Sequence, residues 1–343
     1  MRVLQIGAGS MGTRRIRDLR RRPDVEVTLF DQRADRLVRA VERFGVATVT
    51  TLDEGLATDP HAIVVSTPPD RHAAMVDLAI DRGVHVFCEA DIWSHDPARA
   101  AGAAARGLVA APSCTLRFHP FVRELRRVVA EELGALHAFG YLLSVDAPSW
   151  HPGEGAEYYA RHRPTAPARE MVPFELIALE HVFGPAVAVS GRVVRRGRLD
   201  LDSEDTWSLQ LELAGGATGA LTVAMASPAP ARHGWAVGDG GCLRFDLLAG
   251  TLEHVGPGAR HVGPRVVCDW EESYEPMYDA EIGAFLDAVG GTAPWPYPYT
   301  TGAVVCGTLA AAERSMLTGR VERVDPARQP AAVPDAYDLT SAA

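Results

Sequence analysis

The chain has 343 residues, of which 47% are hydrophobic and 23% are charged, and this length and composition predict two domains that each bury a core. Its 34 Lys and Arg residues against 44 Asp and Glu residues give a net charge of -10, which argues against nucleic acid or an anionic membrane as a partner. Five cysteines without a Cys-x-x-Cys pair argue against a disulfide framework or a zinc ribbon. We therefore expect a cytoplasmic protein, with neither a signal peptide nor a membrane span.

A glycine-rich turn follows the first predicted strand, at residues 3–6, and opens a helix that runs to about residue 21. The turn reads Gly7-Ala8-Gly9-Ser10-Met11-Gly12, which is a complete Gly-x-Gly-x-x-Gly in the strand-turn-helix setting that gives the motif its meaning. Gly7 permits the tight turn, Gly9 leaves room for a pyrophosphate, and Gly12 lets the helix pack on its strand. Alone, such a turn could also bind nothing.

A carboxylate supports the dinucleotide interpretation. Asp31 ends the second predicted strand, residues 26–30, and stands 19 residues after Gly12 (31 - 12), close to the spacing of a residue that bonds the adenosine ribose hydroxyls. Because a carboxylate repels the extra phosphate of NADP, Asp31 favours NAD(H). The nearby Arg33 keeps NADP(H) possible.

Predicted strands and helices then alternate, with helices at residues 33–44, 71–81 and 97–106 and strands at 62–66, 84–88 and 108–111. This alternation predicts an α/β fold with a doubly wound parallel Rossmann sheet that binds its ligand at the carboxyl ends of the strands. Polar or turn residues stand at three such ends, namely Gly7, the run from Thr67 to His72, and Cys88-Glu89-Ala90.

The sequence resembles the Gfo/Idh/MocA family of sugar and inositol dehydrogenases. The resemblance rests on the glycine turn, on Thr67-Pro68-Pro69-Asp70-Arg71-His72, on Gly83-Val84-His85-Val86-Phe87-Cys88-Glu89, on Arg117-Phe118 and Leu133-Gly134-Ala135-Leu136, on residues 281–288 (EIGAFLDA) and on Ala311-Ala312-Glu313-Arg314-Ser315. It implies a Rossmann domain at 1–118 and an α+β domain with a large, mostly antiparallel open sheet at 119–325. The Ala- and Pro-rich composition of residues 326–343 predicts a loosely ordered tail. It also implies a nicotinamide cofactor, a sugar-like substrate, and a homodimer or homotetramer that packs through the open sheet.

Motif and resemblance together predict the cofactor contacts. They are Gly7, Gly9, Ser10, Met11, Gly12, Asp31, Gln32, Arg33, Thr67, Pro68, Pro69, His72, Glu89, Ala90 and Arg117.

The chain departs from the family at two positions that carry proton transfer. Alcohol-oxidising members usually read Glu-Lys-Pro after the fifth strand, whereas this chain reads Glu89-Ala90-Asp91. An alanine can neither donate a proton nor stabilise an alkoxide. The family's Asp-x-x-x-His helical turn matches Glu170 and Phe174, so that the carboxylate is retained and the histidine is lost.

Other residues of the same region offer acid and base groups. Glu170 and Glu175 belong to a helix expected to begin at Arg169, with Pro173 in its first turn. For Glu170, helix capping is an equally good interpretation. His151 and Tyr158 belong to a predicted loop at residues 150–163, whose arginines could hold an anionic group of the substrate.

These observations predict an NAD(P)-dependent oxidoreductase that acts on a sugar-like or cyclitol substrate. Its catalytic candidates are Glu175, Glu170, His151 and Tyr158, and no metal is expected, since no ligand spacing appears among the twelve histidines. Two alternatives stay open. One is a redox-neutral epimerase or lyase that uses bound NAD, and the other is a nicotinamide-binding protein without turnover.

Overall fold

The computed structural model describes residues 1–90, 97–147, 162–195, 203–258 and 263–330. These residues divide into two compact units, one made of residues 1–115 and 275–302 and the other of residues 116–274 and 303–343. The division differs from the expected boundary near residue 118, because residues 275–302 return to the first unit. Of the expected tail, residues 331–343 lie outside the described range.

The first unit holds a six-stranded parallel sheet in the order β3-β2-β1-β4-β5-β6. Its strands are β1 (Arg2–Ile6), β2 (Glu26–Phe30), β3 (Ala47–Val49), β4 (Ala62–Val65), β5 (His85–Cys88) and β6 (Ala110–Pro112). The connecting helices are α1 (Ser10–Arg20), α2 (Ala34–Phe44), α3 (Leu52–Ala57), α4 (His72–Arg82) and α5 (Pro97–Ala105), with the short η1 (Pro69–Arg71) before α4. The expected doubly wound parallel sheet is confirmed.

Burial explains why the strands read as apolar runs. All four residues of β4 are fully buried, as expected for a central parallel strand that helices cover on both faces. The returning segment packs on β5, where Phe87 lies 5.6 Å from Phe285 and 5.9 Å from Trp295, measured between ring centroids. This aromatic contact is one physical reason why residues 275–302 belong to the first unit.

The second unit holds a nine-stranded sheet in the order β14-β13-β12-β11-β7-β10-β9-β8-β15. The strands are β7 (Leu136–Asp146), β8 (Ala186–Val194), β9 (Thr206–Leu213), β10 (Thr218–Ala224), β11 (Ala226–Gly238), β12 (Gly241–Asp246), β13 (Thr251–Val255), β14 (Arg265–Val266) and β15 (Glu322–Arg323). Neighbouring strands are antiparallel except for β7 and β10, so the large, mostly antiparallel sheet is also confirmed.

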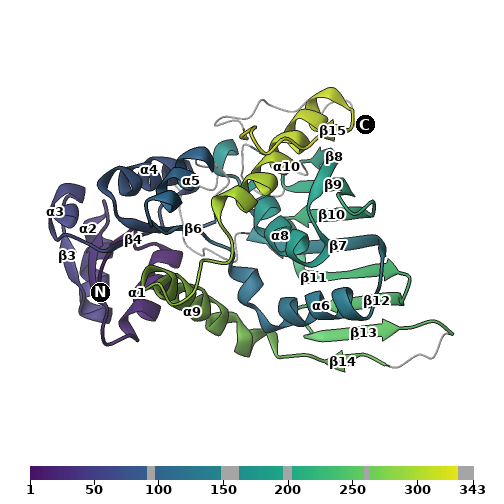
Figure 1. The fold of residues 1–343 in the computed structure, drawn as a ribbon, viewed down its shortest axis with the longest axis horizontal. Coiled ribbons are helices and arrows are strands. Elements are labelled where there is room, and N and C mark those ends of the chain that lie inside the picture. Colours follow the sequence, from purple (N-terminus) through teal and green to yellow (C-terminus); the bar gives the residue numbers. More distant parts are fainter. Residues whose placement is uncertain (91–96, 148–161, 196–202, 259–262, 331–343) are drawn as a thin grey trace. The chain divides into compact units, whose positions relative to one another are not determined.

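Helices α6 (Pro120–Glu131) and α8 (Pro167–Phe183) pack on one another, and α8 packs on β9 and β10 (Figure 1). The short turns η2 (Thr115–Phe118) and η4 (Arg163–Thr165) precede them, and α9 (Trp270–Val289) and α10 (Tyr299–Thr318) complete the chain's described helices. Helix α8 begins at Pro167, earlier than expected, so Pro173 lies inside the helix and Pro167 takes the favourable first position. None of the described helices is long and apolar enough to cross a membrane.

Candidate functional site

The turn between β1 and α1 needs two of its three glycines for its own packing. A Cβ at Gly7 would lie 2.4 Å from the Ser66 carbonyl oxygen, and Gly7 has a φ of 92°. A Cβ at Gly12 would lie 2.0 Å from the Gly7 carbonyl oxygen. A Cβ at Gly9 would meet nothing closer than the Arg36 guanidinium, at 3.6 Å, and its φ of -69° suits any residue. The fold therefore explains Gly7 and Gly12 but leaves Gly9 unexplained.

The start of α1 is suited to an anion. Gly9 is the N-cap residue, no side chain caps the helix, and the first turn has no acidic residue. The first backbone N–H groups, at Ser10 and Met11, have no partner within the helix. An uncapped helix start of this kind attracts the negative charge of a phosphate.

Asp31 follows β2 and is held beside the glycine turn. Its carboxylate accepts hydrogen bonds from the backbone N–H groups of Ala8 (2.7 Å) and Arg33 (2.8 Å). The Arg33 side chain pairs with Asp35, whereas the guanidinium of Arg36 lies 3.6 Å from the Asp31 carboxylate. The Arg36 guanidinium is thus close enough to pair with this carboxylate, although the sequence analysis did not single out Arg36.

The turn after β4 carries Thr67, Pro68, Pro69 and His72. His72 is buried, burial lowers the pKa of its imidazole to about 4, and the ring therefore stays neutral and donates Nε2–H to the Thr67 carbonyl oxygen (2.8 Å). The Thr67 hydroxyl and His72 Nδ1 are buried without a hydrogen-bond partner among the described residues. Buried polar atoms usually have partners, so the Thr67 hydroxyl fits the contact of a bound ligand.

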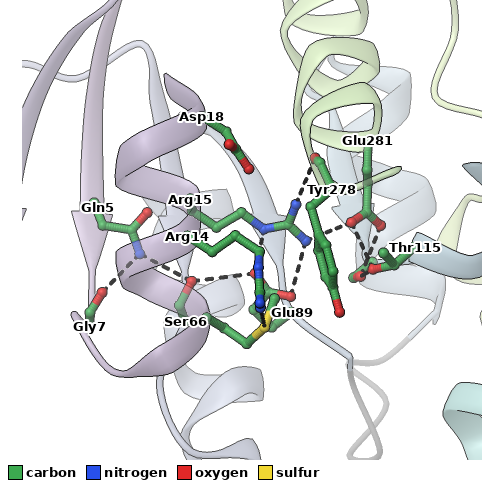
Figure 2. Close-up of polar contacts among 12 residues, drawn as sticks. Gln5, Gly7, Arg14, Arg15, Asp18, Ser66, Glu89, Thr115, Tyr278 and Glu281 are labelled. Carbon is green, nitrogen blue, oxygen red and sulfur yellow. Dashed lines mark hydrogen bonds and ion pairs between the residues drawn. The ribbon is translucent and has the colours of Figure 1, made fainter. Parts of the chain in front are cut away.

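Glu89, at the end of β5, is bound by Arg15 of α1 (Figure 2). Arg15 Nε donates to Glu89 Oε1 (2.6 Å) and Nη2 donates to Oε2 (3.2 Å), which makes a bidentate pair. Arg15 Nη2 also donates to Glu281 of α9 (2.6 Å), and Nη1 donates to the Tyr278 carbonyl oxygen (3.1 Å). Glu89 therefore has its charge satisfied inside the protein, and the next residue, Ala90, has no polar side chain.

The polar network continues from Arg15 through Glu281 (Figure 2). Glu281 accepts hydrogen bonds from the Ser113 hydroxyl (2.9 Å), the Cys114 N–H (2.6 Å) and the Thr115 hydroxyl (2.8 Å). Arg15 and Glu281 are fully buried. Burial alone would lower the pKa of Arg15, but the two carboxylates more than reverse this effect, so Arg15 stays charged.

In the second unit, Glu175 of α8 is fully buried and receives hydrogen bonds at both carboxylate oxygens. The Tyr141 hydroxyl donates to Oε2 (2.7 Å), and the Arg232 guanidinium donates to Oε1. Burial and the neighbouring carboxylate raise the pKa of Tyr141 well above its usual value, so this hydroxyl keeps its proton. Arg232 also lies over the rings of Trp270 and Phe174, 5.1 and 5.9 Å from their centroids.

His119, at the start of α6, completes this buried group. Its ring stacks on Trp270 at 4.6 Å, and its Nδ1 accepts the Phe121 N–H (3.2 Å). Burial, with a smaller effect of Arg232, lowers the pKa of His119 to about 4. The ring is thus neutral with its proton on Nε2, which has no partner among the described residues.

The other predicted site residues are distributed over the structure as follows. Glu170 is partly exposed in the first turn of α8, and Arg117 lies in η2 of the second unit. Gln32 and Arg33 are exposed after β2. His151 and Tyr158 lie outside the described residues. The described part of the chain contains no group of three or more His, Cys, Asp or Glu residues that could hold a metal ion.

Sequence reasoning assigned no site role to Arg15, Tyr141 or Arg232, and it used Glu281 only as part of a motif. The arginines of the first helix favoured a solvated face, whereas Arg15 is fully buried. Arg15 lies one helical turn before the buried Leu19, on the same face of α1, so a buried charge could have been suspected there, but its partner Glu281 is 266 residues away. The ion pairs of Arg15 with Glu281 and of Arg232 with Glu175 form only when the chain folds, so the sequence alone does not reveal them.

Comparison with known proteins agrees with this geometry. Residues 1–101 match the model of a family described as an oxidoreductase family with an NAD-binding Rossmann fold. An uncharacterised oxidoreductase, YrbE of Bacillus subtilis (strain 168), is 28% identical over 139 residues, which are 38% of this chain and 41% of that protein. The match thus spans about two fifths of that relative.

Solved structures match over nearly the whole chain. GenD2 from gentamicin A biosynthesis, in complex with NAD, has a TM-score of 0.79 and 26% identity and covers 95% of this chain and 96% of its own. Levoglucosan dehydrogenase, in complex with NADH and levoglucosan, has a TM-score of 0.78 at 16% identity and covers 95% of this chain and 99% of its own. The second likeness shows the fold alone.

Proposed function

We propose that this chain, which belongs to the Gfo/Idh/MocA family of oxidoreductases, is an NAD-dependent oxidoreductase that acts on a hydroxyl group of a sugar-like or cyclitol substrate. One observation carries the proposal. Gly9 has neither a packing reason nor a backbone reason to be glycine, and it stands at an uncapped helix start. Close approach of a pyrophosphate supplies the missing reason.

The residues at the carboxyl ends of β1, β2 and β4 fit a dinucleotide. The first backbone N–H groups of α1 would bind the pyrophosphate, and Asp31 would accept hydrogen bonds from the adenosine ribose hydroxyls. The buried Thr67 hydroxyl would gain a hydrogen-bond partner on the cofactor. Asp31 favours NAD(H), and Arg36 beside it leaves room for NADP(H) as a second choice. When bound, the nicotinamide accepts or releases a hydride. The complex of GenD2 with NAD supports the same cofactor.

Proton transfer falls to groups other than those of the β5 turn, because Glu89 is held by Arg15 and Ala90 has no polar atoms. Glu175 and Glu170 on α8 remain candidates, together with His151 and Tyr158. Glu170 is partly exposed, whereas Glu175 is fully buried with both oxygens bonded. This difference favours Glu170 for direct proton exchange and favours Glu175 for holding Arg232 and Tyr141 in place.

A cofactor titration tests the proposal first. Quenching or enhancement of reduced nicotinamide fluorescence should show NADH binding to the purified protein, with weaker binding of NADPH. Absence of binding at millimolar concentrations of both would refute the proposed function. A screen of polyols, sugar phosphates and nucleotide sugars with NAD+, followed by nicotinamide absorbance, should then identify a substrate that reduces the cofactor.

The same screen separates the alternatives. Product formation without net cofactor consumption would favour a redox-neutral epimerase or lyase. Tight cofactor binding without any product would favour a binding protein without turnover. The homodimer or homotetramer that the resemblance implies is a further proposal, and light scattering on the purified chain tests it directly.

A further inference from the structure

We propose that Arg15, Glu89 and Glu281 act together as positioning residues for the nicotinamide half of the cofactor. Glu281 on α9 holds Arg15, and Arg15 holds Glu89 and with it the carboxyl end of β5. The inference rests on the proposed function, because it concerns the same cofactor. It goes beyond that function because it assigns a role to helix α9, which begins more than 150 residues after β6, the last strand of the Rossmann sheet.

Strand order identifies the half of the cofactor that would be affected. In the order β3-β2-β1-β4-β5-β6, Asp31 at the end of β2 marks the adenosine side of the glycine turn. A dinucleotide spans the crevice where the strand order reverses, so its other half extends over the ends of β4 and β5. Glu89 and Ala90 stand at that end of β5. The nicotinamide side is therefore the side that Arg15 and Glu281 anchor.

The anchoring network reaches the glycine turn itself. The Gln5 side chain donates to the Gly7 carbonyl oxygen (3.0 Å) and to the Ser66 hydroxyl (3.1 Å), and that hydroxyl makes a long contact of 3.5 Å to Glu89. Arg15 lies on α1, the helix that this turn opens. The ends of β1, β4 and β5 and the middle of α1 are thus joined through one set of polar contacts (Figure 2).

Burial makes this set sensitive to the loss of a single charge. Arg15 is fully buried between two carboxylates, and its guanidinium also lies over the Phe87 ring, 4.7 Å from the centroid. A fully satisfied buried network is rigid, whereas a partly satisfied network must rearrange. Loss of the Glu281 charge would leave Arg15 with one carboxylate partner, Glu89, and with the Tyr278 carbonyl oxygen, so that the end of β5 could shift.

A pair of variants tests the inference. Glu281→Gln removes one carboxylate charge from Arg15 without touching Glu89. Asp279→Asn is the matched control, because Asp279 binds Arg22, just after the end of α1 (2.9 Å), and makes no hydrogen bond or ion pair with Arg15 or Glu89 among the described residues. Each variant is titrated with NADH, which has the nicotinamide, and with ADP-ribose, which lacks it.

We expect Glu281→Gln to weaken NADH binding by about 10-fold while the affinity for ADP-ribose changes by less than about 2-fold. Asp279→Asn should leave both affinities unchanged within that margin. If Glu281→Gln does not fold, Ser113→Ala serves in its place, because it removes one hydrogen bond to Glu281 and no charge. This variant should also weaken NADH binding more than ADP-ribose binding, by a smaller factor.

Equal losses for the two ligands, or no loss for either, would overturn the inference, because a purely structural role does not distinguish the two halves of the cofactor. These outcomes differ from failure of the proposed function, in which the unaltered protein would bind neither NADH nor ADP-ribose.

Discussion

Alanine substitutions in the glycine turn give a direct test of whether a dinucleotide crosses it. Gly9→Ala places a methyl group 3.6 Å from its nearest neighbour, at a φ of -69° that alanine adopts freely. Because alanine also restricts the unfolded chain, we expect the free energy of unfolding to stay the same or rise by about 0.4 to 1 kcal/mol. Gly12→Ala instead places a methyl group 2.0 Å from a backbone oxygen, so we expect a loss of about 1 to 3 kcal/mol or more.

The effect of Gly9→Ala on cofactor binding should be large, although its effect on the free energy of unfolding is small. The Gly9→Ala methyl group occupies space that a pyrophosphate would need, and we expect the dissociation constant for NADH to rise at least 10-fold, equal to about 1.4 kcal/mol. Gly102→Ala, in helix α5 with nothing within 4 Å, is the matched control and should leave binding unchanged. Urea unfolding and NADH fluorescence titrations measure the two quantities separately. A stable Gly9→Ala protein that binds NADH as tightly as the unaltered chain would refute the reasoning.

Three further predictions concern other carboxylates. Glu175→Gln should destabilise the fold by about 3 to 5 kcal/mol, because Arg232 loses its buried partner, whereas Tyr141→Phe should cost only about 1 kcal/mol; urea unfolding of both variants checks this order, and equal losses would contradict it. Burial raises the pKa of Glu180 to about 8, so the stability that its protonated form contributes is fully present below the unfolded pKa of about 4.5 and is lost as pH rises through 8. Glu180→Gln should therefore flatten the fall in the free energy of unfolding between pH 5 and 9. An unchanged fall in that range would show that Glu180 is not its source. Asp31→Asn should raise the affinity for NADP+ relative to NAD+ by about 10-fold, and an unchanged ratio in competitive titrations would remove Asp31 as the selectivity residue.

Local patterns predicted most of the first unit, because apolar runs and the glycine turn act over a few residues. Strand β3 and helix α3 were not predicted, although Thr51 and Glu54 form a capping box, which is a recognisable signal for the start of a helix. The large, mostly antiparallel second sheet was predicted from the family resemblance and not from periodicity, and its nine strands were not counted in advance. Arg15 and Arg232 could not be assigned from sequence, because a buried arginine is favourable only beside carboxylates that distant segments supply.

The altered β5 turn and the buried arginines have one common consequence. Ala90 stands where the family usually has a lysine, and the carboxylate of Glu89 is paired with Arg15. We therefore expect neither residue to exchange a proton with a substrate. The first unit is thus equipped to hold a cofactor and lacks an acid or base at this described turn. The second unit does contain such groups. Glu170 is partly exposed, and Tyr141, Glu175 and Arg232 form one hydrogen-bonded group. Because removal of a hydride from a hydroxyl-bearing carbon also requires loss of the hydroxyl proton, we expect a group of the second unit to take that proton. A Glu170→Gln variant that keeps full NADH affinity and loses turnover by about 10²-fold or more would establish that division, and full turnover would assign the proton to another group.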